Sequence, residues 1–150
     1  MKFSGKAVLL TAIAFIFSGL SAKSATSVNR ADDDIKVQIN KYWADYAAGF
    51  QKINDEKDNQ KATALCDQLG KKLAPQYRQL KQRSIAWKKS HSSTEWLNLV
   101  TWTQHNPNVI KTMTIRSSPG MLMRMAQDAK FTTAYGMLTN AAPIDAGTTL

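Results

Sequence analysis

Apolar residues recur at helical spacing along most of this chain, beginning about thirty residues from its start. The first stripe advances in steps of three or four residues through Ile35, Ile39, Tyr42, Tyr46, Phe50 and Ile53. That spacing is the period of an amphipathic α-helix. The acidic run at residues 31–34 (ADDD) predicts the helix start, because carboxylates cap free N–H groups and favour the dipole there. Residues 26–30 are then a short polar leader.

A second stripe begins near residue 60 and continues through Ala62, Leu65, Cys66, Leu69, Leu73, Tyr77, Leu80, Ser84 and Trp87. Pro75 falls inside this register, and proline removes a backbone donor and clashes with the preceding turn. Either one helix ends near Lys72 and another starts at Pro75, or a single helix kinks there. The unbroken register favours a kink or a tight joint.

The remaining elements are shorter. Ser92 and Glu95 have the spacing of a capping box, and the helix that follows ends before Pro107. Residues 108–116 are helical or irregular, because no second strand is present to pair with them. A last helix starts with Ser118 as its cap and Pro119 at its first position. It runs to about residue 130, or as far as 138, and its inward side is Leu122, Met125, Ala126 and Ala129.

These elements predict a single all-α domain, a compact bundle of four or five helices over residues 26–139, with a flexible tail at 140–150. Residues 1–25 have the order of a cleaved signal peptide: Lys2 and Lys6, an apolar run at 7–17, then small residues. The run is shorter than the roughly 20 residues of a membrane-spanning helix, so a retained anchor is the weaker alternative. We therefore expect a periplasmic or secreted protein.

Charge is the most informative part of the composition. The chain has 20 Lys and Arg against 11 Asp and Glu, a formal net charge of +9. No acidic residue occurs between Asp67 and Glu95, and this interval holds seven basic residues on or beside the polar face of the predicted second helix: Lys71, Lys72, Arg78, Lys81, Arg83, Lys88 and Lys89. This pattern predicts an anion-binding surface. The alternative is an ordinary solvated face.

Two tryptophans, Trp43 and Trp102, lie to one side of their stripes and are candidate exposed anchors at a partner surface. Met121, Met123 and Met125 suggest a soft-metal (copper) site, although successive members are ~200° apart on a helix. Cys66 has no second cysteine to pair with and lies on an apolar stripe, which predicts a buried, inert thiol.

The pattern gives little support for catalysis. His91 and His105 are in separate breaks without metal-ligand spacing, and the acidic clusters are at a helix start and in a connection. We expect no enzyme activity, no cofactor and no nucleic-acid partner. The hypothesis that remains is an exported binding protein for an acidic macromolecule, either chaperone-like or an inhibitor or immunity protein. Its alternative is peripheral binding to anionic membrane or lipopolysaccharide.

Overall fold

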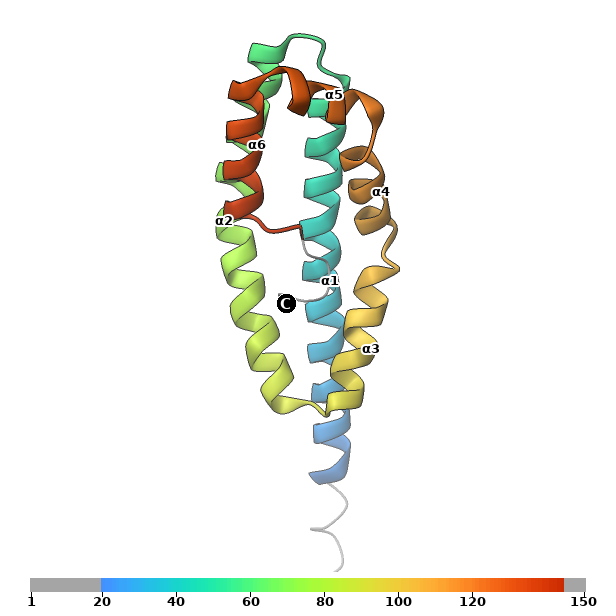
Figure 1. The fold of residues 1–150 in the computed structure, drawn as a ribbon. Helices are drawn as coiled ribbons and strands as arrows, with labels where there is room; N and C mark the ends of the chain where they lie inside the picture. Colours follow the sequence, from blue (N-terminus) through green and yellow to red (C-terminus); the bar gives the residue numbers. More distant parts are fainter. Residues whose placement is uncertain (1–19, 145–150) are drawn as a thin grey trace, which may run out of the picture. The chain divides into compact units, whose positions relative to one another are not determined.

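The computed structural model describes the backbone of residues 20–144 and side chains from residue 34 onward. The chain divides into two compact units, Met1–Asp33 and Asp34–Leu150. The described residues form six helices and no strand, which confirms the all-α class but exceeds the four or five helices expected. They are α1 (Leu20–Asp55), α2 (Asn59–Ser90), α3 (Ser93–Gln104), α4 (Pro107–Arg116), α5 (Pro119–Gln127) and α6 (Ala129–Ala141) (Figure 1).

Helix α1 begins earlier than the sequence indicated. It starts at Leu20, so residues 26–30 are helical and the predicted start at residues 31–34 is wrong. The physical reason is that this stretch contains no glycine or proline, and polar residues alone do not end a helix. The predicted apolar stripe is confirmed, with every member from Ile35 to Ile53 at most 3% exposed. Most of the predicted signal peptide, residues 1–19, lies outside the described residues.

Helix α2 is a single helix that continues through Pro75. The Asp58 carboxylate caps its start by accepting from the amides of Gln60 and Lys61, at 2.8 and 3.0 Å. The two long helices are antiparallel: Asp34 bonds to Arg83, Asp45 bonds to Lys72, and Gly49 meets Leu69. Residue numbers therefore rise along α1 as they fall along α2.

Caps fix the shorter helices. The capping box of Ser92 and Glu95 is present at the start of α3. Asn106 caps α4, which confirms the helical alternative for this segment. The Asn106 and Asn108 amides also donate to the side-chain oxygen of Asn40, each at 3.1 Å. The junction between α3 and α4 is thereby joined to α1.

Asp128 divides the predicted last helix into α5 and α6, because its carboxylate accepts from the Phe131 amide, 3.0 Å away, and caps a new start. The expected inward side of this segment is right only for Met125, which is partly buried against the core. Leu122 is 51% exposed, and Ala126 and Ala129 are exposed, whereas Met121 is fully buried. Met121 is the buried residue of this nine-residue helix, and the Ser118 hydroxyl at its start donates to the Asn54 side-chain oxygen at 2.9 Å.

The predicted tail is ordered over the part that is described. Asn140 and Ala141 are exposed at the end of α6, whereas Ala142 and Ile144 are 0% and 3% exposed and belong to the core. The Tyr46 hydroxyl donates to the Ala142 carbonyl oxygen at 3.0 Å. The sequence left this contact undetected because it joins residues 96 positions apart.

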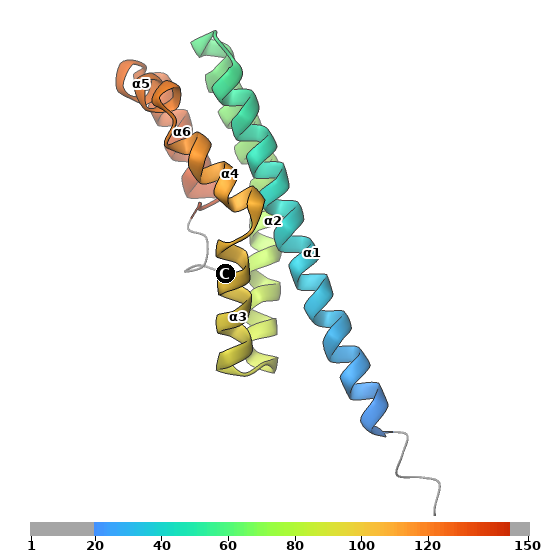
Figure 2. The same ribbon diagram turned by 90° about the vertical axis from the view of Figure 1, so that its right-hand side faces the viewer.

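Within the unit that begins at Asp34, α1 and α2 form a long pair, and α3 and α4 run back along α1 (Figure 2). Helix α6 returns beside α2, and Gly70 of α2 lies against Leu138 of α6. Its end is level with Tyr46, where Ala142 is held. Among residues 34–144, the half of the bundle near the turn between α1 and α2 therefore has four helices around its core, while the other half has α1, α2 and α3.

Candidate binding surface on helix α2

All seven basic residues predicted for the binding surface are exposed and lie on α2. Two of them form ion pairs with carboxylates of α1. Lys72 Nζ lies 2.9 Å from Asp45 Oδ1, and Arg83 Nη1 lies 3.0 Å from Asp34 Oδ2. These two cations hold α2 against α1, and a partner would have to compete with an internal carboxylate for each of them.

Asp45 shows how tightly this contact is built. Burial raises the pKa of its carboxyl, but hydrogen bonds from Lys72, Lys41 and Gln76 outweigh burial and hold that pKa below its usual value. The bonds are 2.9, 3.2 and 3.2 Å long. The charge of Lys72 is therefore largely satisfied within the molecule.

The other five cations form no ion pair with any residue of the described chain. We call them the basic stripe: Lys71, Arg78, Lys81, Lys88 and Lys89. At 100° per residue they share one flank of α2, and the stripe extends over ~27 Å at 1.5 Å per residue. Exposed Ile85 (46%) lies within it. Carboxylates on α1 thus pair with the two cations on one flank of α2, and the stretch from Lys71 to Lys89 on the other flank has five cations without a carboxylate partner in the described chain.

One cation of the stripe contacts an aromatic ring. Lys88 Nζ lies 4.9 Å from the centre of the Trp96 ring of α3, which is half-buried. Beneath it, the His91 ring stacks on the buried Trp87 ring with centres 3.8 Å apart. The end of α2 and the start of α3 therefore combine a cation with aromatic surface.

The two candidate tryptophan anchors have different outcomes. The expected exposure of Trp43 is wrong, since its side chain is 2% exposed and its ring packs on Tyr42 and Tyr46. The buried face of α1 is wider than its apolar stripe predicts, because the α3–α4 junction also covers this side of α1 through Asn40. Trp102 is half-buried, with Lys36 Nζ 5.9 Å from the ring centre.

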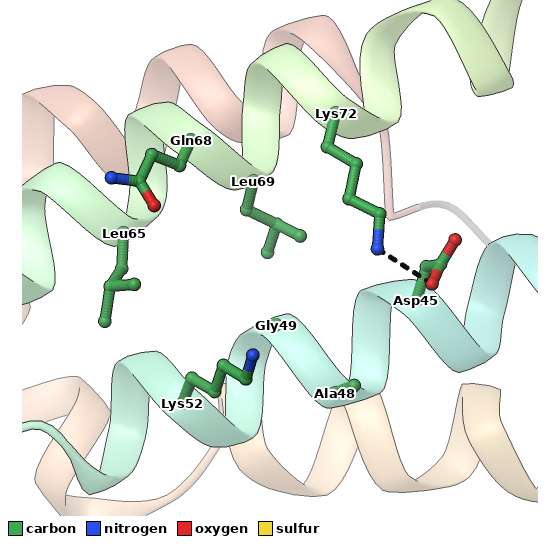
Figure 3. Close-up of a pocket in the computed structure, with 8 residues that line it drawn as sticks. All are labelled: Asp45, Ala48, Gly49, Lys52, Leu65, Gln68, Leu69 and Lys72. Carbon is green, nitrogen blue, oxygen red and sulfur yellow. Dashed lines mark hydrogen bonds and ion pairs between the residues drawn. The ribbon is translucent and has the colours of Figure 1, made fainter.

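A groove between α1 and α2 was not predicted (Figure 3). It has a volume of about 170 Å³, and its lining residues are Asp45, Ala48, Gly49, Lys52, Leu65, Gln68, Leu69 and Lys72. The Asp45–Lys72 ion pair crosses one end, and leucine side chains line the α2 side. Ligand pockets usually have ~300–1,000 Å³, so this groove is too small for a cofactor. Only a tertiary contact creates it, and the sequence carries no signal for it.

The remaining candidate catalytic and metal-binding residues lie in environments that suit a structural role. Burial raises the pKa of the fully buried Cys66 thiol to about 12, which agrees with the predicted inert thiol. Because α5 is helical, Met123 points away from the other two methionines: Met121 is fully buried and Met125 partly buried, whereas Met123 is 57% exposed. Nδ1 of His105 lies 2.8 Å from the Thr101 carbonyl, to which it donates. No three His, Cys, Asp or Glu side chains gather into a possible metal site in the part of the chain described.

Among the described residues, no helix is both long and apolar enough to cross a membrane. The predicted apolar run at 7–17 lies outside this part of the chain. Comparison of the sequence with protein-family models and with curated proteins, and of the structure with solved structures, gives no match.

Proposed function

We propose that this chain is a non-catalytic binding protein that docks onto an acidic protein through the basic stripe of α2. The observation that carries the proposal is the division of charge on this helix. Asp34 and Asp45 occupy the cations facing α1 and leave five exposed cations with no carboxylate partner in the described chain. A surface that only interacts with solvent normally mixes both signs.

A surface of this kind favours encounter with an acidic partner. Five like charges along one helix create a positive potential that raises the association rate and selects against basic partners. Such long-range attraction decays over ~8 Å at physiological ionic strength. We therefore expect binding that weakens steeply as salt is added.

An acidic protein is a better partner for this surface than a membrane. An amphipathic helix binds a bilayer by inserting its apolar face among the lipids. On α2 that face is already in the core, where Leu73, Leu80 and Trp87 are at most 8% exposed. The stripe offers a bilayer charge but little apolar surface.

The proposal also covers location. With residues 1–25 as a signal peptide, the chain would work in the periplasm or outside the cell. Its partner would be an acidic protein of that compartment, bound in the manner of a chaperone client or of an enzyme or toxin that is inhibited. Cleavage is tested by mass spectrometry of the chain recovered after export, which should lack about 25 residues.

Binding is tested with two defined probes, poly-L-glutamate and lipid vesicles with or without anionic lipid, each at about 20 and 500 mM salt. The test variant reverses the basic stripe to Glu. A matched control reverses five exposed lysines outside it, which also form no ion pair in the described chain: Lys52, Lys57, Lys61, Lys111 and Lys130.

The expected result is salt-sensitive binding to poly-L-glutamate that the stripe variant loses and the control variant largely keeps. Equal losses in the two variants would show that only net charge matters and would overturn the proposal. Binding to anionic vesicles without binding to poly-L-glutamate would replace it with the membrane alternative.

A further inference from the structure

Among residues 34–144, helix α6 fills the fourth position of the bundle over only part of its length. Helix α6 has 13 residues beside the 32 of α2. Its contact with α2 is marked by Gly70, where an added Cβ would lie 3.5 Å from the Leu138 backbone. Helix α6 lies beside the first half of α2, and α3 lies beside the second half. Along that second half, no further helix among residues 34–144 continues the line of α6 (Figures 1 and 2).

The face of α2 that meets α6 continues into this open half. Lys81 is eleven residues beyond Gly70 and Lys88 is eighteen beyond it. At 3.6 residues per turn these distances are about three and five full turns, so both lysines are on the same side of α2 as Gly70. Both are exposed, and Lys88 lies over the half-buried Trp96 ring of α3. An element that extended the line of α6 would meet two cations and an indole.

We propose that an amphipathic helix of a partner protein, carrying acidic residues, docks on this open half in line with α6. We call this surface, formed by Lys81, Lys88 and Trp96, the docking face. The inference rests on the proposed function and names the chemistry of its partner. Covering the docking face with a purely apolar helix would leave two charges unpaired, which is costly. A second copy that presented the same face would bring cations against cations.

The spacing of Lys81 and Lys88 sets the spacing of the acidic residues that the partner helix needs. Seven residues on a helix are two turns, ~10.5 Å. The partner helix therefore needs two acidic residues seven positions apart on one face. Apolar residues three or four positions after the first acid would cover Trp96 and half-buried Val100, which are one turn apart on α3. This is recognition of an amphipathic helix by a helical surface, with apolar anchors between charged contacts.

The probe is a synthetic helix of about 20 residues with Glu seven positions apart, Leu between them on the same face, and neutral polar residues elsewhere. A scrambled peptide of the same composition places the two Glu on opposite faces. Binding of each labelled peptide to the full chain is measured by fluorescence anisotropy. We expect the patterned peptide to bind at least ~10-fold more tightly than the scrambled one, since each well-placed charge contact adds to affinity.

Two variants with the same change in net charge locate the peptide. Lys81→Glu with Lys88→Glu alters the docking face, and Lys71→Glu with Lys89→Glu alters cations on α2 that are about 100° away from it. We expect a loss of at least ~10-fold in the first and less than ~3-fold in the second. Lys81→Ala with Lys88→Ala, expected to lose several-fold, keeps the test valid if the charge-reversed variant fails to fold.

Several results would overturn the inference. Equal losses of peptide affinity in the two charge-reversed variants would refute the docking face. If the parent chain still bound poly-L-glutamate, the proposed function would stand. Loss of binding to every acidic probe would remove both. Deletion of residues 145–150 that raised peptide affinity ~10-fold or more would assign the docking face to the chain's own terminus. Dimerisation that competes with the peptide would assign it to a second copy.

Discussion

Arg124 joins three elements, and its removal gives a sharp test of the fold. Its guanidinium donates to the carbonyl oxygens of Ile53 and Glu56, at the end of α1, and to the Asn59 side-chain oxygen at 3.1 Å. It also lies 5.4 Å from the centre of the Phe131 ring. A cation at this position satisfies free carbonyl groups and the negative end of the helix dipole.

The expected cost of Arg124→Ala follows from these contacts. Hydrogen bonds from a charged donor contribute ~1.5–3 kcal/mol each when buried, and the low end applies to this half-buried side chain. The helix-end charge adds ~0.3–1 kcal/mol, and the ring contact ~0.5–1 kcal/mol. Because the contacts share one side chain and are not additive, we expect a loss of about 2–4 kcal/mol in the free energy of unfolding.

Urea unfolding followed by circular dichroism measures this loss. With a slope of ~1–3 kcal/mol/M, the midpoint should fall by about 1 M or more with little change in slope. Arg124→Lys is the control: it keeps the charge but cannot reach three acceptors at once, so about half of the loss should return. A loss below about 0.5 kcal/mol for Arg124→Ala, or equal losses in both variants, would refute the reasoning.

Further predictions concern the contact between α1 and α2. In Gly49→Ala the new Cβ would lie 2.4 Å from a Leu69 methyl group, so that flexible side-chain end must shift beside the groove; this overpacking cost is offset by the ~1 kcal/mol that alanine gains over glycine in a helix, and we expect a net change within ~1 kcal/mol. Leu69→Ala removes the contact, so Gly49→Ala should be stabilising in that background in the same urea assay. Asp45→Asn should cost ~1 kcal/mol at pH 7. The folded pKa of this carboxyl is depressed, so its contribution exists above the unfolded pKa of about 3.8 and disappears as pH falls through the folded value; the urea midpoints of variant and parent should therefore approach each other as the pH is lowered below 3.8, and a gap that stays constant down to the lowest pH at which the parent folds would contradict the assignment. With its pKa raised to about 12, Cys66 should react with a disulfide reagent at pH 8 only after urea is added, and rapid reaction in the folded chain would contradict its burial.

Part of the candidate surface could be derived from the sequence. The exposure of all seven cations on α2 followed from their place opposite or beside the Leu73 and Leu80 stripe. Their division into paired and unpaired groups did not, because Asp34 and Asp45 are 49 and 27 residues from the cations they bind. A helical wheel shows which side of a helix a residue occupies, but it does not show which element packs against that side.

Trp43 and Ala142 show the same limit in the core. Periodicity placed Trp43 at the margin of its stripe, but α1 is covered by other elements on more than one side, so the margin is buried. Ala142 lies in a segment with the composition of a tail, yet its carbonyl accepts from buried Tyr46. In both cases the decisive partner is far away in the sequence.

The sequence by itself determined most of the helices of this protein, because their signals are local, although it did not give the start of α1 or the break at Asp128. Apolar residues at steps of three and four set the buried faces of α1 and α2, and Ser92, Asn106 or Ser118 before each short helix supplies the cap its free amides require. Only the tertiary structure decided which charges on α2 stay unpaired and where the fourth position of the bundle ends. Those outcomes depend on the packing of α1 and α6 against α2. Such contacts join residues that are far apart in the sequence, so the local sequence around each residue does not predict them.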